Sequence, residues 1–259
     1  MFGDGALLHG FEFKECKYIS NKNKWWRRLR IILEPIMNKM QKWKLISTIS
    51  IVQDQILENY TRESTLIKTC KGAISNIRFI ELGFFQSESF FENTFINNFS
   101  IKSKYIKEAT IFINKIPQNT HKIFIHIRRD DYETFNIYGK TTLLPMKYYL
   151  NQIEWFQKNR KNCFFIVLSD DPEYVEKYFS EIENKIISKG NSPIVDLSIM
   201  SLCNSGILSP SSFGWWGSYF MKDRDVIFAP KHWAGFKSNI DCNSNPLASF
   251  MTAIEINDE

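Results

Sequence analysis

The sequence has little of what marks a disulfide-bonded, metal-binding or membrane-spanning protein. Its 259 residues include five cysteines, and no two of them form a C-x-x-C pair. A scattered, odd set of cysteines predicts neither a disulfide framework nor a zinc site. No apolar run reaches the ~18–20 residues of a membrane-spanning helix, and the N-terminus lacks a signal-peptide pattern. We therefore expect a cytoplasmic protein without a metal ion or a bound cofactor.

The excess of basic over acidic residues is also small. Lys and Arg total 33 against 28 Asp and Glu, which gives a formal net charge of +5. Nucleic-acid binding, which needs a concentrated basic patch, is not predicted, whereas phosphate-bearing small ligands remain possible.

One segment, residues 22–44, does concentrate basic residues. Within it Trp25, Leu29, Ile36 and Trp43 recur at helical spacing among Lys and Arg. Two interpretations stay open. The helix rests on anionic lipid at the inner face of the membrane, as a peripheral contact, or it packs on the domain with solvated basic residues. Pro35 is expected to kink or split it.

Strand and helix patterns alternate through the second half of the chain. The predicted strands are 122–127, 163–168, 206–208 and 226–229, the helices are 145–159, 172–182 and 211–221, and residues 194–203 suggest a short strand and helix. The first half is less regular, with an extended piece at 10–15, a strand at 77–82 and a helix at 101–115. This alternation predicts an α/β fold with a parallel sheet that binds ligands at the carboxyl ends of its strands.

The first polar strand end contains His126, Arg128, Arg129, Asp130 and Asp131. Two adjacent arginines are costly to desolvate unless an anion or a carboxylate meets them. Ion pairing with the two following aspartates is one interpretation, and binding of an anionic ligand is the other.

The second strand end is Ser169, Asp170 and Asp171, directly before Pro172. We expect Asp170 to cap the following helix, with the proline in its first turn. A capping role explains one carboxylate. The other is suited to accept the paired N–H donors of a guanine ring or a ribose hydroxyl.

The third strand end is Ser211, Ser212 and Phe213, which open a helix containing Trp215 and Trp216. Hydroxyls and free backbone N–H groups at a helix N-terminus can bind an anion. The alternative is an ordinary serine-capped helix whose tryptophans pack in the core. Three polar strand ends on one parallel sheet together favour a phosphate-bearing ligand.

These segments resemble a known family. Residues 126–132, 168–172 and 208–220 resemble, in order and spacing, the three motifs of the α-1,2-fucosyltransferases of glycosyltransferase family 11, and residues 83–91 and 226–233 resemble it too. The resemblance implies a GT-B-like fold of two facing Rossmann-like domains, of which the N-terminal unit would be incomplete. Residues 1–116 would form the acceptor-side domain and residues 117–259 the GDP-sugar-binding domain.

The resemblance also implies a reaction. An inverting, metal-independent enzyme would move L-fucose from GDP-fucose to a galactose hydroxyl, in α-1,2 linkage, on a galactose-ended surface glycan. Arg128 and Arg129 would bind the diphosphate and His126 would support the nucleotide. Asp170 or Asp171 would hold guanine or ribose, and residues 211–213, Ser211, Ser212 and Phe213, would contact phosphate. From its place beside the arginines, Asp131 is the candidate general base, with Glu88 and Glu133 next.

Two departures from the family keep an alternative open. A Gly-rich segment, G-G-x-G-N-Q, is absent, and Asp130 stands where the family usually has glycine. A nucleotide-sugar-binding protein without turnover is therefore the second hypothesis. A metal-dependent transferase would need a D-x-D motif, and Asp223 and Asp225 form the only match, in what reads as a charged turn.

Overall fold

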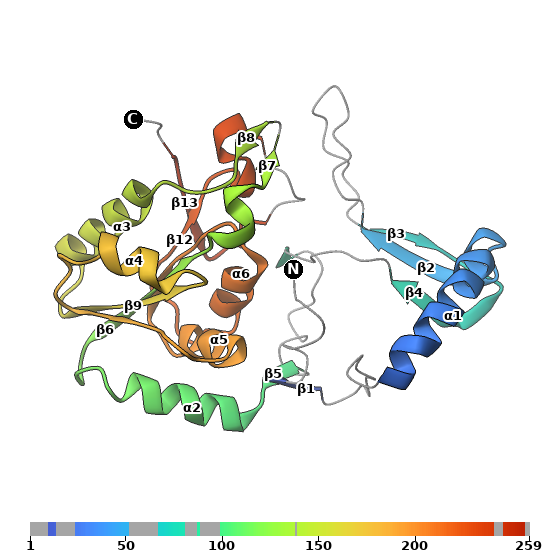
Figure 1. The fold of residues 1–259 in the computed structure, drawn as a ribbon, viewed down its shortest axis with the longest axis horizontal. Coiled ribbons are helices and arrows are strands. Elements are labelled where there is room, and N and C mark those ends of the chain that lie inside the picture. The colour runs from blue at the N-terminus through green and yellow to red at the C-terminus, as the bar shows by residue number, and fades with distance from the viewer. Residues whose placement is uncertain are drawn as a thin grey trace.

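A six-stranded parallel sheet dominates the structure, a computed structural model that describes residues 10–13, 24–51, 67–80, 87–88, 99–137, 139–240 and 246–256. The strand order is β10-β9-β6-β11-β12-β13, and every neighbouring pair is parallel (Figure 1). The strands are β6 (His121–Ile127), β9 (Cys163–Ser169), β10 (Lys185–Ile187), β11 (Ser205–Ile207), β12 (Ile227–Pro230) and β13 (Met251–Ile254). Numbered along the chain, this is the 3-2-1-4-5-6 order of a Rossmann-like unit.

Helices cover both faces of this sheet, as Figure 1 shows. They are α2 (Ser103–Ile113), α3 (Met146–Asn159), α4 (Pro172–Tyr178), α5 (Pro193–Ser201) and α6 (Ser212–Tyr219). The alternation of side chains along β6 explains the two layers. Ile123 and Ile125 pack with α3 and α4, whereas Phe124 packs with α2, α5 and α6.

Short elements follow the ends of β6 and β12. A 3₁₀ turn, η5 (Asp130–Glu133), leads into a small antiparallel hairpin of β7 (Asn136–Ile137) and β8 (Lys140–Thr141). A second 3₁₀ segment, η6 (Trp233–Ser238), follows β12. These elements lie beyond the carboxyl ends of the parallel strands, where the sequence places its polar motifs.

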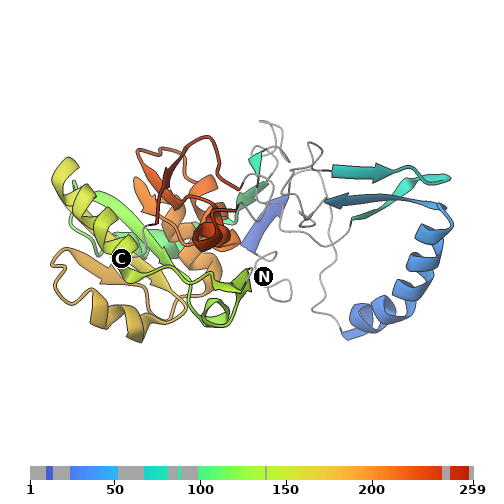
Figure 2. The ribbon, with the colours of Figure 1, turned by 90° about the horizontal axis from the view of Figure 1, so that it is seen from above.

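The N-terminal part contains a second, smaller sheet of order β3-β2-β4, formed by β2 (Ile46–Ile51), β3 (Ile67–Cys70) and β4 (Ile74–Ile80). Helix α1 (Lys24–Lys42) precedes it, and Figures 1 and 2 show both at the opposite end of the molecule from α3 and α4. β1 (Phe11–Phe13) pairs with β5 (Phe99–Ile101), and Phe11 packs on Phe99 and Phe220.

The predicted α/β class is confirmed, and most predicted elements of the second half occur within a few residues of their expected bounds. Two local predictions were wrong. Residues 194–203 contain no strand, since Pro193 opens α5, and the strand before it is β10. The helix predicted for residues 172–182 ends at Tyr178. Strand β13 was not predicted at all. Helix α1 runs through Pro35 without a break, so the expected split does not occur, and the expected kink stays a prediction.

Some predictions fall on residues that the structure does not describe. Of the family-like stretch 83–91, only Ser87 and Glu88 are described. Within the described residues, no helix combines the length and the apolar character needed to cross a membrane. The domain bounds 1–116 and 117–259 stay a prediction.

Candidate functional site

The three predicted strand ends meet at the switch point of the sheet. From β6 the chain goes to β9 and β10 on one side and then crosses to β11 on the other. A crevice forms where the strand order reverses, outside the carboxyl ends of the strands, and ligands of such sheets bind there. The loop after β6 and the N-terminus of α6 therefore flank one position.

Arg128 lies in this position with its side chain about one-third exposed. Its Nη1 is 2.9 Å from Asp170 Oδ2, and its Nε donates to Asp131 Oδ1 at 2.8 Å. Burial alone would lower the pKa of Arg128, but Asp170 and Asp131 outweigh it and raise the pKa. The guanidinium is thus a permanent cation held by two carboxylates, with part of its surface left for a ligand.

Arg129 has different surroundings. Its side chain is 11% exposed, its Nη2 donates to Glu133 Oε1 at 2.6 Å, and its Nε lies 3.4 Å from Asp171 Oδ2. The guanidinium carbon also lies 3.2 Å from the centre of the Tyr174 ring, a cation–π contact. Ion pairing and stacking occupy this side chain, so the two adjacent arginines are not equivalent. Its predicted diphosphate contact stays a prediction.

The helix cap expected of Asp170 is supplied by the next aspartate. Asp171, not Asp170, caps α4, because its side chain accepts from Tyr174 N at 3.0 Å. Asp170 instead accepts from Arg129 N at 2.9 Å and pairs with Arg128. Ser169 Oγ accepts from Asp171 N at 3.1 Å, which stabilises the turn. The predicted contacts of these residues with guanine or ribose stay untested.

Burial raises the pKa of Asp170, while the Arg128 guanidinium opposes that rise. This carboxylate is held between the Arg128 guanidinium and the Arg129 backbone N–H, so it is a fixed part of the site. It orients the loop after β6 against the end of β9.

Ser209 joins the ends of β6 and β11. Its hydroxyl accepts from Arg128 N at 2.9 Å and donates to His126 O at 2.9 Å. The Tyr149 hydroxyl from α3 lies 2.6 Å away. Both Ser209 and Tyr149 are buried, so this cluster sets the position of the Arg128 backbone. In the sequence Ser209 follows an apolar strand and precedes Pro210 and Ser211, but its tertiary partners are not visible there.

The N-terminus of α6 faces the same loop. Ser211 caps the helix and accepts from Phe213 N at 3.3 Å, while Ser212 is the first helical residue. The Tyr132 hydroxyl donates to Pro210 O at 2.5 Å and fastens η5 to this turn. The partial positive charge of a helix N-terminus therefore lies beside the arginine loop. Trp215 is buried in the core, as one interpretation of the sequence expected.

His126, near the end of β6, packs against the first turn of α6. It is buried, and burial together with Arg128 lowers its pKa to about 3, so the imidazole is neutral at physiological pH. A Cβ added to Gly214 in α6 would lie 2.8 Å from His126 Nδ1. Glycine at this position lets the first turn of α6 approach the end of β6.

Asp196 is a further polar group at this edge that the sequence did not assign to the site. It lies in α5, and its Oδ1 accepts from Ser188 Oγ, just after β10, at 2.6 Å. Burial raises its pKa to about 6, against hydrogen bonds from Ser188 and Asn191. β10 lies two strands from β6, and strands lie about 4.8 Å apart, so a ligand reaching from Arg128 toward Asp196 crosses about 10 Å.

The remaining candidate carboxylates lie in different places. Glu133 pairs with Arg129, and Glu88 accepts from Ser249 N at 2.6 Å. Asp225 lies before β12, at the amino edge of the sheet, and forms a two-pronged pair with Arg160. The D-x-D match thus lies at the edge of the sheet opposite Arg128, and its second carboxylate, Asp225, is paired with the Arg160 guanidinium.

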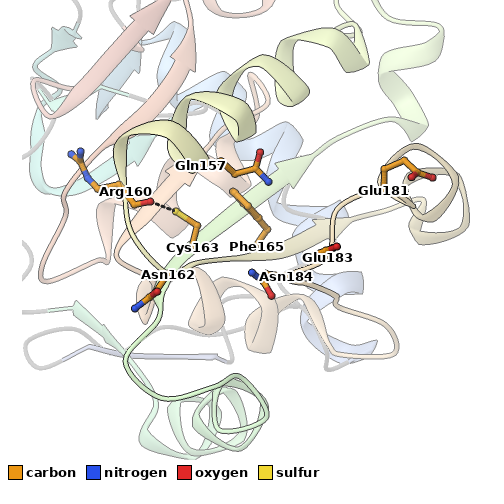
Figure 3. A pocket seen from close by; sticks show the side chains of 8 residues that line it. All are labelled: Gln157, Arg160, Asn162, Cys163, Phe165, Glu181, Glu183 and Asn184. Atoms are coloured by element: carbon orange, nitrogen blue, oxygen red, sulfur yellow. Dashed lines mark hydrogen bonds between the residues drawn. The ribbon is translucent and has the colours of Figure 1, made fainter.

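A polar hollow of about 420 Å³ also lies at the amino edge, near the start of β9 (Figure 3). Its lining residues are Gln157, Arg160, Asn162, Cys163, Phe165, Glu181, Glu183 and Asn184. Because ligands of parallel sheets bind at the carboxyl edge, this hollow does not belong to the site around Arg128.

Comparison with known proteins points to one family. The model of glycosyl transferase family 11 matches residues 18–245. An α-1,2-colitosyltransferase of Escherichia coli is 34% identical over 123 residues, which are 44% of this chain and 41% of the relative. WbnK, an O-antigen biosynthesis glycosyltransferase of Escherichia coli, is 30% identical over 48% of this chain and 42% of its own length. The galactoside 2-α-L-fucosyltransferase SEC1 of Bos taurus is 22% identical over 52% and 39%.

Two solved structures give weaker matches. POFUT1 in complex with GDP-fucose has a TM-score of 0.41 and 13% identity, over 50% of this chain and 46% of that one. The α-1,6-fucosyltransferase NodZ, soaked with GDP-fucose, has a TM-score of 0.41 and 11% identity, over 80% and 68%. The matched part spans about two-fifths of each curated relative. On the family model, which covers most of the sequence, the chain belongs to glycosyltransferase family 11.

Proposed function

We propose that this protein transfers L-fucose from GDP-fucose to a galactose hydroxyl of a surface glycan, in α-1,2 linkage. The observation that carries the proposal is the position of the Arg128 guanidinium, in the loop after β6 and paired with Asp170 at the end of β9, while α6 begins after the neighbouring strand β11. A diphosphate placed there meets a permanent cation and free helix N–H groups together.

The nucleoside then extends across the ends of β9 and β10. Asp170 and Asp171 make arginine contacts and a helix cap, whereas Asp196 has a carboxylate hydrogen-bonded by a serine hydroxyl. A buried carboxylate is suited to accept the paired N–H groups of guanine. We therefore add Asp196 to the predicted base-binding residues, beside Asp170 and Asp171.

In the reaction, the acceptor oxygen forms a bond to the anomeric carbon from the face opposite GDP, and the bond from that carbon to the β-phosphate oxygen breaks. GDP leaves with the bonding electrons, and Arg128 and the α6 N-terminus stabilise its growing negative charge. The acceptor proton passes to a carboxylate, for which Asp131 is the candidate. Since arginine and a helix dipole supply the positive charge, no metal ion is needed.

The names of the relatives support a glycosyltransferase but differ in the sugar. One is named for colitose and another for fucose on a galactoside. We propose fucose and treat colitose as the competing donor. The acceptor proposal rests on the galactoside relatives.

A donor and acceptor screen on the purified chain tests the proposal. GDP-fucose, GDP-colitose and GDP-mannose are offered with galactose-ended and galactose-free acceptors, in EDTA or in Mn²⁺, and product linkage is determined. We expect α-1,2-linked fucose on galactose with equal rates in EDTA and Mn²⁺. Transfer of another sugar corrects the donor, and loss of turnover in EDTA that Mn²⁺ restores contradicts metal independence.

GDP binding measured on the same preparation separates the second hypothesis. A chain that binds GDP but transfers no sugar to any acceptor is a nucleotide-sugar-binding protein without turnover. A chain that does not bind GDP contradicts both hypotheses.

A further inference from the structure

Helix α1 presents large apolar side chains to solvent. Ile32 is 63% exposed, Leu33 42% and Ile36 49%, and Trp43, just after the helix, is 67% exposed. We call these four residues the α1 stripe. Elsewhere among the described residues exposed apolar side chains occur singly in the chain, for example Ile111 on α2 at 66%. Single exposed apolar residues are common on soluble proteins, whereas a contiguous group marks an interaction surface.

The spacing of the stripe places its members on one side of the helix. At about 100° per residue, Ile32, Ile36 and Trp43 fall within about 40° of one another, and Leu33 lies about 60° further round. Trp43 N bonds to Lys39 O at 3.0 Å, so the helical path continues to this residue. With a rise of about 1.5 Å per residue, the stripe is about 16 Å long.

Basic residues accompany the stripe. Lys39, Lys42 and Lys44 are exposed around its C-terminal end. The helix sequence contains six basic residues and one acidic residue, so it accounts for the whole formal net charge of +5. A second copy of this surface would repel it, whereas a negatively charged surface would attract it.

We propose that α1 binds the surface of an anionic phospholipid bilayer and lies parallel to it. The stripe enters the boundary between headgroups and acyl chains, and the lysines contact lipid phosphates. Trp43 suits this boundary because its ring is apolar and its indole N–H is polar. Figure 2 shows α1 at one end of the molecule, remote from α3 and α4, where a flat surface can approach it. This proposal does not depend on the reaction catalysed.

Vesicle flotation with the full chain tests it. One set of vesicles contains phosphatidylcholine with about 30% phosphatidylglycerol, and the other contains phosphatidylcholine alone. We expect the chain to float with the anionic vesicles, at least about tenfold more strongly than with the neutral ones, and to be released by added salt. Binding that is absent on anionic vesicles, or equal on both sets, overturns the proposal.

Variants locate the surface. Ile32→Ser with Ile36→Ser should abolish flotation, whereas Ile111→Ser, an equally exposed isoleucine on α2, should leave it unchanged. Lys39→Glu with Lys42→Glu changes only exposed charges, so it should fold normally and lose anionic selectivity. Thermal melting checks folding of each variant. Flotation that survives in both double variants contradicts a role for α1.

Sedimentation velocity tests the competing occupant, a second copy of the chain. We expect a monomer in the absence of lipid over a wide concentration range. A dimer that dissociates when Ile32 and Ile36 are replaced by serine would overturn the lipid proposal and assign the stripe to self-association.

Discussion

Arg128 and Asp170 form an ion pair across the ends of two neighbouring strands, with Nη1 and Oδ2 2.9 Å apart. Because β6 and β9 are parallel and paired in register from His121–Cys163 to Ile127–Ser169, their following residues necessarily come together. The pair holds the guanidinium at the carboxyl edge of the sheet before any ligand arrives.

Replacement of Arg128 tests its part in transfer. Arg128→Ala should lower kcat/KM on the order of 100- to 1,000-fold, as expected when a preorganised donor to developing charge is lost. Arg128→Lys should recover little, because an ammonium cannot form the paired contacts of a guanidinium. Steady-state kinetics with GDP-fucose measures both. Near-normal turnover in both variants would mean that the arginine serves the fold alone.

Arg129 should respond differently. Arg129→Ala loses the stacking on Tyr174 and the pairs with Glu133 and Asp171, so we expect a loss of about 1–3 kcal/mol in the free energy of unfolding. The effect of Arg128→Ala on unfolding should be smaller, since that side chain is more exposed. Urea titration of the two variants side by side provides the comparison. Equal destabilisation by both would contradict the division of roles.

Asp131→Asn separates a base from an orienting residue. Asparagine keeps the size of the side chain but cannot take up a proton at neutral pH, so a catalytic base predicts a fall in kcat of about 100-fold or more with GDP affinity little changed. The contact of Asp131 with Arg128 Nε predicts instead that GDP affinity and kcat fall together if its role is to orient the guanidinium. In that case Glu133 and Glu88 are the next bases to replace.

Asp196 should make the folded protein less stable as pH rises, and we expect the opposite direction for GDP binding. Burial raises its folded-state pKa to about 6, from an ordinary 3.8, so the folded protein binds more protons than the unfolded chain between these values. The stabilising contribution is complete below about pH 4 and is lost as pH rises through 6. Asp196→Asn should therefore unfold at a higher temperature than wild type at pH 7, with no such gain at pH 4.

If the Asp196 carboxylate binds guanine, GDP affinity should weaken as pH falls below about 6, because the acceptor becomes protonated. GDP phosphates also titrate, so the Asp196→Asn profile is the control. We expect weak, flatter binding in the variant by calorimetry. Unchanged GDP affinity in Asp196→Asn at pH 7 would remove this residue from the site.

The role of Ser209 is tested by comparing Ser209→Ala with Tyr148→Phe, a substitution at another buried residue. Ser209→Ala leaves Arg128 N and the Tyr149 hydroxyl without this partner, and we expect a cost of about 1–3 kcal/mol in stability and weaker GDP binding. Tyr148→Phe removes a hydroxyl that donates to Leu208 O, not to the arginine loop, so it should lose stability without losing GDP affinity. If the two variants lose affinity in proportion to stability, Ser209 has no positioning role.

Much of the second half could be predicted from sequence because its signals are local. Buried apolar runs in β6 and β9, and proline or serine at helix starts, indicate elements without knowledge of their partners. Strands β10 and β13, at the two edges of the sheet, are shorter and less buried, and lack such a run. Their pairing with β9 and β12 defines them, and pairing is not visible in a linear sequence.

The sequence by itself determined the α/β class, the three polar strand ends and the family motifs, because each depends on residues near one another in the chain. Only the tertiary structure decided which arginine faces the switch point, that Asp171 rather than Asp170 caps α4, and that Ser209, Tyr149 and Asp196 join the site. Several of these decisions depend on contacts between residues far apart in the chain, such as Arg129 with Asp170 and Arg128 with Ser209, whose separations are 41 and 81. Such contacts arise from strand register and helix packing, which bring those side chains together only in the folded chain.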